Sequence, residues 1–173
     1  MEELKSKILN KDVQLTFFFN IKLKCKFLDK FLPVLTYIGS AAATVSICFL
    51  LIGIGSAKVR NAGITALVSL TVSHIIVEIV KRNVCRKRPK DMLEEINVFN
   101  VPIDLYSFPS GHSTAIFSIA VTVSLYMPLL AFLVLPAALM VGLSRVYLGV
   151  HYLSDVIAGM VLATATSVLF YCI

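Results

Sequence analysis

The chain has 173 residues, of which 58% are hydrophobic and 15% are charged. Soluble domains are usually about half apolar and about a quarter charged. This composition, with a mean hydropathy of +0.87, therefore excludes an ordinary soluble domain and indicates a membrane protein. The net charge of +6 comes with no soluble basic fold, so nucleic-acid binding is not expected. Residues 1–173 are predicted to form a single domain.

The N-terminal part of the chain, residues 4–27, is expected to form an amphipathic helix that lies in the membrane interface. Its apolar stretch, residues 13–19, is short and is followed by a lysine-rich sequence, which does not fit a cleavable signal peptide. Residues 1–27 are therefore assigned to an interfacial segment.

Five later segments are long and apolar enough to cross a membrane as helices, which takes about 20 residues. They are residues 31–56, 62–80, 111–127, 128–147 and 154–172. The predicted fold class is all-α, an integral-membrane bundle of about five transmembrane helices. With this number of crossings, the long loop 81–110 and the turn 148–153 lie on the same side of the membrane as the N-terminal segment.

Polar residues are concentrated in three segments on that side. Their sequences are KRNVCRKRP at residues 81–89, FPSGHS at 108–113 and SRVYLGVHYLSD at 144–155. Arg and Lys side chains suit phosphate oxygens, and backbone N–H groups around Ser110 and Gly111, at the start of a helix, can face an anion. The convergence predicts a phosphate-binding site, although the Ser110 hydroxyl could instead cap its own helix.

Two histidines supply candidate chemistry. His151 and Asp155 are spaced so that, on a helix, the carboxylate holds one imidazole nitrogen and leaves the other free. His112 is brought to the same side, where it can transfer protons. The four cysteines lack the spacing of a zinc site. We therefore expect small apolar residues or free thiols at these positions.

The three polar segments resemble the signatures of the type 2 phosphatidic acid phosphatase (PAP2) family, K-x6-RP, PSGH and SR-x5-H-x3-D. Every position matches in order: Lys81 to Arg88-Pro89, Pro109 to His112, and Ser144-Arg145 through His151 to Asp155. The resemblance covers about residues 28–173 and implies an enzyme that acts on lipid phosphates.

The resemblance also implies a role for each matching residue. His151 would attack phosphorus and form a phosphohistidine, and Asp155 would orient His151. His112 would protonate the departing oxygen and then activate water. The phosphoryl oxygens would be bound by Lys81, Arg88, Ser110, Gly111 and Arg145. Neither a metal ion nor a cofactor is implied, which agrees with the lack of a carboxylate cluster in the sequence.

Other polar residues near the signatures are interpreted separately. A solvated or head-group-facing surface is expected for Arg82, Arg86 and Lys87. His74 and Glu78 share a helical face with Lys81, so they either support Lys81 or contact the substrate. Residues 90–107 are expected to form a lid that faces the head group.

The predicted function is hydrolysis of a membrane lipid phosphate or pyrophosphate, of the undecaprenyl pyrophosphate, phosphatidylglycerophosphate or phosphatidic acid type. Two alternatives stay open: a phosphotransferase that uses the same phosphohistidine, and a non-catalytic lipid-binding or transport protein. The resemblance implies a multi-pass protein of the cell membrane with an outward-facing site. The positive-inside rule opposes this orientation, since every Lys and Arg except Lys58 and Arg60 lies on the side of the site.

Overall fold

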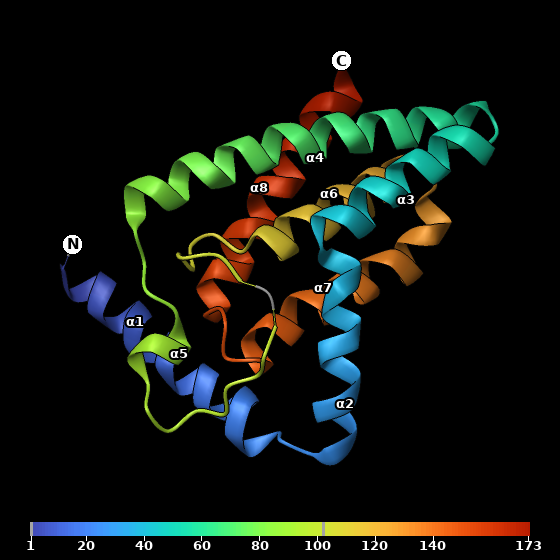
Figure 1. The fold of residues 1–173 in the computed structure, drawn as a ribbon. Helices are drawn as coiled ribbons and strands as arrows, with labels where there is room; N and C mark the ends of the chain where they lie inside the picture. The colour runs from blue at the N-terminus through green and yellow to red at the C-terminus, as the bar shows by residue number, and fades with distance from the viewer. Residues whose placement is uncertain (1, 102) are drawn as a thin grey trace.

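The computed structural model describes residues 2–101 and 103–173, and the elements formed by these residues are all helical (Figure 1). The α-helices are α1 (Glu2–Phe17), α2 (Lys26–Leu35), α3 (Ala41–Ile54), α4 (Ala57–Val84), α5 (Pro89–Met92), α6 (Gly111–Tyr126), α7 (Ala131–Tyr147) and α8 (Leu153–Cys172). Three short segments of other helical types are η1 (Phe18–Lys22), η2 (Thr36–Gly39) and η3 (Pro128–Leu130). The prediction of an all-α membrane bundle is confirmed.

Fewer helices than expected are long and apolar enough to cross a membrane. Three meet both requirements in the described part of the chain: Ala57–Met92, Pro128–Tyr147 and Leu153–Cys172. The pair Lys26–Gly39 and Ala41–Ile54 makes a fourth crossing if it is counted as one span. The expected span 111–127 forms α6, whose 16 residues are too few for a hydrocarbon core of about 30 Å at about 1.5 Å per residue. The count of five is therefore not confirmed.

The first expected span, residues 31–56, is bent rather than a single straight helix. Its two helical segments are bent by 57° at Ser40. Ser40 is extended, and its side chain accepts a hydrogen bond from the backbone N–H of Ala43 at 3.3 Å, so it caps the start of α3. A Cβ atom on Gly39 would lie 3.1 Å from the carbonyl oxygen of His112. The bend thus places η2 tightly against the start of α6.

The N-terminal segment is shorter than the expected helix 4–27, because α1 and η1 end at Lys22 and α2 begins separately at Lys26. One stripe of this segment, formed by Asp12, Thr16 and Asn20, is buried. The Asn20 side chain donates a hydrogen bond to the carbonyl oxygen of Tyr147 at 2.7 Å. The segment therefore packs on the bundle at the end where the polar loops lie (Figure 1).

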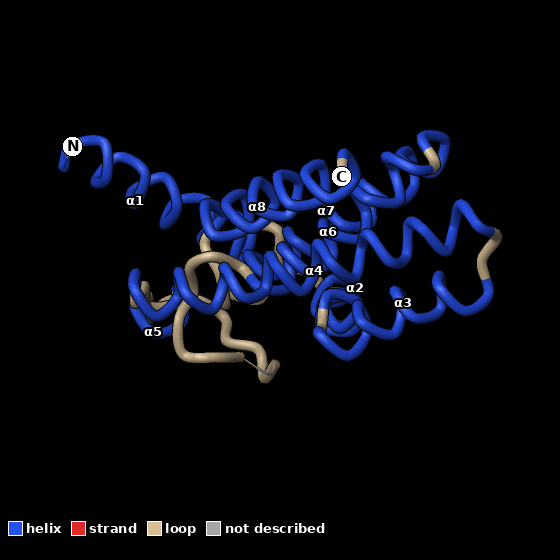
Figure 2. Tube along the Cα trace, turned by 90° about the horizontal axis from the view of Figure 1, so that it is seen from above, coloured by secondary structure: helices blue, strands red, loops and turns tan. Residues whose placement is uncertain are grey.

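Helix α6 lies at the centre of the bundle, in contact with α4, α7 and α8, and Figure 2 shows these helices running alongside one another. Residues 113–120 are all buried. The hydroxyls of Thr114 and Ser118 donate to carbonyl oxygens one turn earlier, at 2.9 and 3.0 Å. Because these polar groups are hydrogen-bonded, the helix can be buried without an unpaired hydroxyl at either position. The N-terminus of α6 is therefore firmly placed at one end of the bundle.

Gly159 sets how closely α8 approaches α6. A Cβ atom here would lie 2.8 Å from the carbonyl oxygen of Ser110 and 2.8 Å from Oγ1 of Thr114. We expect Gly159→Ala to destabilise the protein by about 1–3 kcal/mol, the usual effect of overpacking, and to lower the melting temperature measured by circular dichroism in detergent. Gly53→Ala is the matched control, since a Cβ atom there meets nothing within 4 Å. Equal melting temperatures for the two variants would contradict this expectation.

Candidate active site

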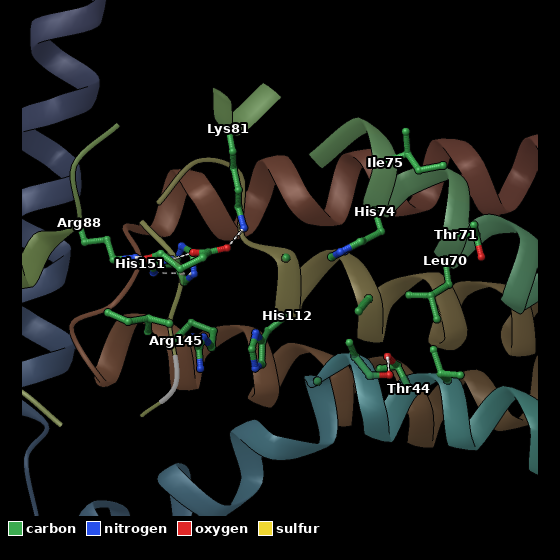
Figure 3. A pocket seen from close by; sticks show the side chains of 17 residues that line it. Thr44, Leu70, Thr71, His74, Ile75, Lys81, Arg88, His112, Arg145 and His151 are labelled. Atoms are coloured by element: carbon green, nitrogen blue, oxygen red, sulfur yellow. Dashed lines mark hydrogen bonds and ion pairs between the residues drawn. The ribbon is translucent and has the colours of Figure 1, made fainter. Parts of the chain in front are cut away.

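The three polar segments meet at one end of the bundle, where they enclose a cavity of about 490 Å³. The end of α4, the start of α6 and the turn between α7 and α8 supply its polar walls. Figure 3 shows their side chains directed toward one another. The predicted site residues that line the cavity are Lys81, Arg88, Gly111, His112, Arg145 and His151.

His151 lies in the turn between α7 and α8 and is 2% exposed. Its Nε2 is 3.2 Å from Nη1 of Arg88. A guanidinium can only donate, so this contact requires an unprotonated Nε2 and places the imidazole proton on Nδ1. Burial and the nearby charges of Arg88 and Arg145 lower the pKa of His151 well below its ordinary value. His151 is therefore a neutral imidazole whose unprotonated Nε2 faces Arg88, and an unprotonated nitrogen is what a nucleophile needs.

Asp155 stands beside the other imidazole nitrogen. Its Oδ2 lies 3.5 Å from Nδ1 of His151, longer than a good hydrogen bond. The same oxygen accepts the backbone N–H of Tyr152 at 2.9 Å. Nδ1 of His151 is buried and has no hydrogen-bond partner among the described residues. Asp155 is thus placed next to the nitrogen that it was predicted to hold, although it does not line the cavity.

Three buried cations, Lys81, Arg88 and Arg145, face the cavity and are called the cavity cations below. Arg145 donates from Nη1 to the hydroxyl of Thr36 at 2.9 Å, whereas its buried Nε has no partner among the described residues. Buried donors are rarely left unpaired, and this N–H is an unsatisfied donor next to the cavity wall. Within residues 2–101 and 103–173, no group of three or more His, Cys, Asp or Glu side chains is placed to hold a metal ion.

Ser110 takes the capping role that its sequence left open. Its hydroxyl accepts a hydrogen bond from the Ser113 hydroxyl at 2.9 Å and lies 3.4 Å from the Ser113 backbone nitrogen. Ser110 is fully buried and does not line the cavity. Gly111 does line it, and a Cβ atom there would lie 3.5 Å from Nζ of Lys81. The backbone at Gly111 therefore adjoins one of the cavity cations.

His74 and Glu78 share a face of α4, but their side chains have different contacts. Glu78 forms an ion pair with Lys81 at 3.7 Å, so it supports that lysine. His74 lines the cavity together with His112 (Figure 3). The contact of Glu78 with Lys81 fits the supporting role, and contact of His74 with a substrate stays a prediction.

Sequence reasoning missed Asp104, which lies in the loop before α6 and forms ion pairs with both Lys81 and Arg88. Burial acts to raise the pKa of Asp104, but Lys81 and Arg88 outweigh it and lower the pKa below its ordinary value. An ionised carboxylate therefore lies between two cations that were predicted to bind phosphoryl oxygens. Residues 90–107 were predicted to face the head group, but their sequence gave no reason to choose Asp104 over the neighbouring acidic residues.

The prediction that Arg86 belongs to an exposed surface with Arg82 and Lys87 is wrong. Arg82 and Lys87 are exposed, whereas Arg86 donates to Oδ1 of Asp155 at 2.7 Å and to Oδ2 of Asp12 at 2.8 Å. The sequence does not distinguish Arg86 from its exposed basic neighbours, because charge alone does not show which side chain points into the protein.

The chain belongs to the PAP2 superfamily, whose family model matches residues 62–173. It is 33% identical over 113 residues to an undecaprenyl-diphosphatase of Sulfolobus acidocaldarius, which covers 65% of this chain and 55% of the relative. It is 42% identical over 93 residues to a decaprenylphosphoryl-5-phosphoribose phosphatase of Mycobacterium tuberculosis, covering 53% of this chain and 49% of the relative. The chain spans about half the length of the curated relatives that it matches.

The fold is shared with a solved structure. The crystal structure of Aquifex aeolicus LpxE matches with a TM-score of 0.82 at 24% identity, covering 92% of this chain and 94% of that one. The helical membrane-protein fold is thereby confirmed.

Asp104→Asn should strengthen the binding of inorganic phosphate, because the substitution removes a negative charge that competes for Lys81 and Arg88. We expect the Kd for phosphate, measured by isothermal titration calorimetry in detergent, to fall about three- to tenfold, since the carboxylate is half-exposed and its ion pairs are partly screened. Glu95→Gln is the control, an exposed acidic residue of the same loop. An unchanged or weaker affinity in Asp104→Asn would count against this assignment.

Proposed function

We propose that this protein is a phosphatase that hydrolyses the phosphate or pyrophosphate of a membrane lipid through a phosphohistidine at His151. Candidate substrates are of the undecaprenyl pyrophosphate, phosphatidylglycerophosphate or phosphatidic acid type. The observation that carries the proposal is a single cavity that holds an unprotonated His151, a second histidine, His112, and three buried cations. The names of the two curated relatives support a phosphorylated membrane lipid as the substrate class.

In the first step, Nε2 of His151 attacks phosphorus while the bond from phosphorus to the leaving oxygen breaks. Burial and the charge of Arg145 lower the pKa of His112 below its ordinary value. The negative charge of the bound phosphate opposes this shift, so that His112 holds a proton in the complex and gives it to the leaving oxygen. The cavity cations stabilise the charge that develops on the other phosphoryl oxygens. The products are the dephosphorylated lipid and a phosphoimidazolium whose Nδ1–H faces Asp155.

In the second step, a water molecule attacks phosphorus and the bond between phosphorus and Nε2 breaks. His112, now neutral, takes the proton from the water and so returns to its protonated form. Inorganic phosphate leaves, and the Nε2 lone pair of His151 is restored. The same histidine thus serves as acid and then as base, which the position of His112 in the cavity wall makes possible.

The remainder of the cavity suits the apolar part of a lipid. It extends between α3 and α4, where its lining includes Val45, Leu70 and Ile75 (Figure 3). A phosphate held by the cavity cations would leave the attached chain against these residues. The cavity is therefore polar at the histidine end and apolar beyond it, as binding of a phosphorylated lipid requires.

The roles of the two histidines can be separated by trapping the intermediate. His112→Asn should lower phosphate release by about 10²–10⁴-fold, the usual contribution of general acid–base catalysis, and should still yield radiolabelled enzyme after an alkaline quench with a ³²P-labelled lipid phosphate. His151→Asn should lose both phosphate release and the label. A labelled His151→Asn protein, or undiminished turnover in that variant, would rule out this nucleophile.

We further propose that the protein resides in the cell membrane with its active site facing outward, as the PAP2 resemblance suggests. The positive-inside rule is weakened here by the contacts of the basic residues at the site end. Lys81, Arg88 and Arg145 line the cavity, and Arg86 binds carboxylates. These four cations are engaged by the site, so they do not report on orientation as loop cations do.

Two exposed cysteines at opposite ends of the bundle test the orientation. Cys85 follows α4 at the site end, and Cys172 ends α8 at the other end. In variants that keep only one cysteine, a membrane-impermeant maleimide should label Cys85 in intact cells and Cys172 only after permeabilisation. The reverse pattern would place the site in the cytosol.

A further inference from the structure

Arg86 connects three polar groups at the site, although it is not one of the fixed positions of the K-x6-RP signature. Its Nη1 donates to Oδ1 of Asp155 at 2.7 Å and to the hydroxyl of Ser154 at 2.7 Å. Its Nη2 donates to Oδ2 of Asp12 at 2.8 Å. The guanidinium carbon lies 4.1 Å from the centre of the Tyr152 ring. These contacts hold the guanidinium on several sides.

Asp12, the partner of Arg86, comes from α1 and lies outside the residues matched by the family model. Its side chain is 4% exposed. Besides Arg86, it accepts the backbone N–H of Ser154 at 3.0 Å and the Ser154 hydroxyl. The first N–H groups of a helix have no partner within the helix, so Asp12 satisfies one of them at the start of α8. One carboxylate thus joins the N-terminal segment to both Arg86 and the helix that carries Asp155.

We propose that Arg86, held in place by Asp12, is a positioning residue that fixes the Asp155 carboxylate for its action on His151. Asp155 is fully buried, and a buried carboxylate is costly unless it has a cation or several hydrogen bonds. His151 lies 3.5 Å away and is neutral, so it does not compensate this charge. The backbone N–H of Tyr152 supplies a hydrogen bond but no full charge. Arg86 supplies both a hydrogen bond and a full positive charge to Asp155.

The two carboxylate oxygens of Asp155 have different partners. Oδ1 is taken by Arg86, so Oδ2 is turned toward Nδ1 of His151. This orientation favours the imidazole tautomer with the proton on Nδ1, the same tautomer that the contact between Arg88 and Nε2 requires. The inference rests on the proposed function for its effect on turnover, but the tautomer of His151 is a property of the resting protein.

The kinetic test compares matched Arg→Gln substitutions. Arg86→Gln should lower kcat for release of phosphate from a lipid phosphate about 10- to 100-fold, as the loss of a partner that orients a functional ligand does, with KM changed less than about threefold. Arg82→Gln, at an exposed position on the same segment, is the control. Arg86→Lys should recover part of the loss, because it keeps the charge but not the planar fork.

The link to α1 is tested by a double-mutant cycle. Asp12→Asn should lower kcat by a smaller factor than Arg86→Gln, and the double variant should be no slower than Arg86→Gln alone, since both changes act through one network. Additive losses, a rise in KM at constant kcat in Arg86→Gln, or an equal loss in Arg82→Gln would overturn the proposal.

A second measurement does not depend on turnover. The chain has three histidines, so ¹⁵N-histidine NMR in detergent can report the tautomer of His151, assigned with His151→Asn. The wild type should show the proton on Nδ1. Arg86→Gln should shift the Nδ1 signal of His151 as the Asp155 carboxylate loses its partner, while the Arg88 contact keeps Nε2 unprotonated and the His74 signal stays in place as a check on folding. Unchanged His151 signals would overturn the inference. A shifted Nδ1 signal in a protein that releases no phosphate would reject the proposed function and keep the inference.

Discussion

Arg88 is 1% exposed, and burying an ion without partners costs several kcal/mol. Several backbone groups at the cavity end of the bundle accept hydrogen bonds from Arg88. Nη1 donates to the carbonyl oxygen of Val150 at 2.6 Å, and Nη2 donates to that of Tyr106 at 2.9 Å. The Val150 carbonyl can face Arg88 because Gly149 has a φ of +69°, a conformation that glycine adopts readily. The turn that presents His151 is thus shaped around a buried cation.

The second requirement is that helices from distant parts of the chain approach closely enough to keep these groups in contact. Gly159 lets α8 meet the start of α6, and Gly39 lets η2 meet the same helix. Thr36 of η2 then reaches Nη1 of Arg145 at 2.9 Å. Because interiors are close-packed, a displacement at any of these contacts is transmitted to its neighbours. The geometry of the cavity therefore depends on small residues that take no part in chemistry.

The sequence predicted the helical class and the residues that line the polar end of the cavity, because signature residues and hydropathy are local properties. It could not predict the bend at Ser40 from hydropathy alone, since an apolar run reads the same whether straight or bent. The burial of α6 could not be predicted either, because hydroxyl residues such as Ser118 look polar in the sequence. In the structure their hydroxyls are hydrogen-bonded within the helix. Asp104 and Arg86 were missed for a related reason: their roles depend on partners distant in sequence, Lys81 for one and Asp12 for the other.

Two carboxylates face arginines at this site, and their burial gives them different functions. Asp104 is 49% exposed, so water can replace Lys81 and Arg88 as its partners at little cost. A phosphoryl group carries more charge than one carboxylate and can therefore take its place. Asp155 is fully buried and forms an ion pair with Arg86. Moving Asp155 away would leave both its carboxylate and the Arg86 guanidinium without a charged partner. Under the proposed function, a phosphoryl group would replace Asp104 among the cavity cations while the carboxylate behind His151 stays fixed.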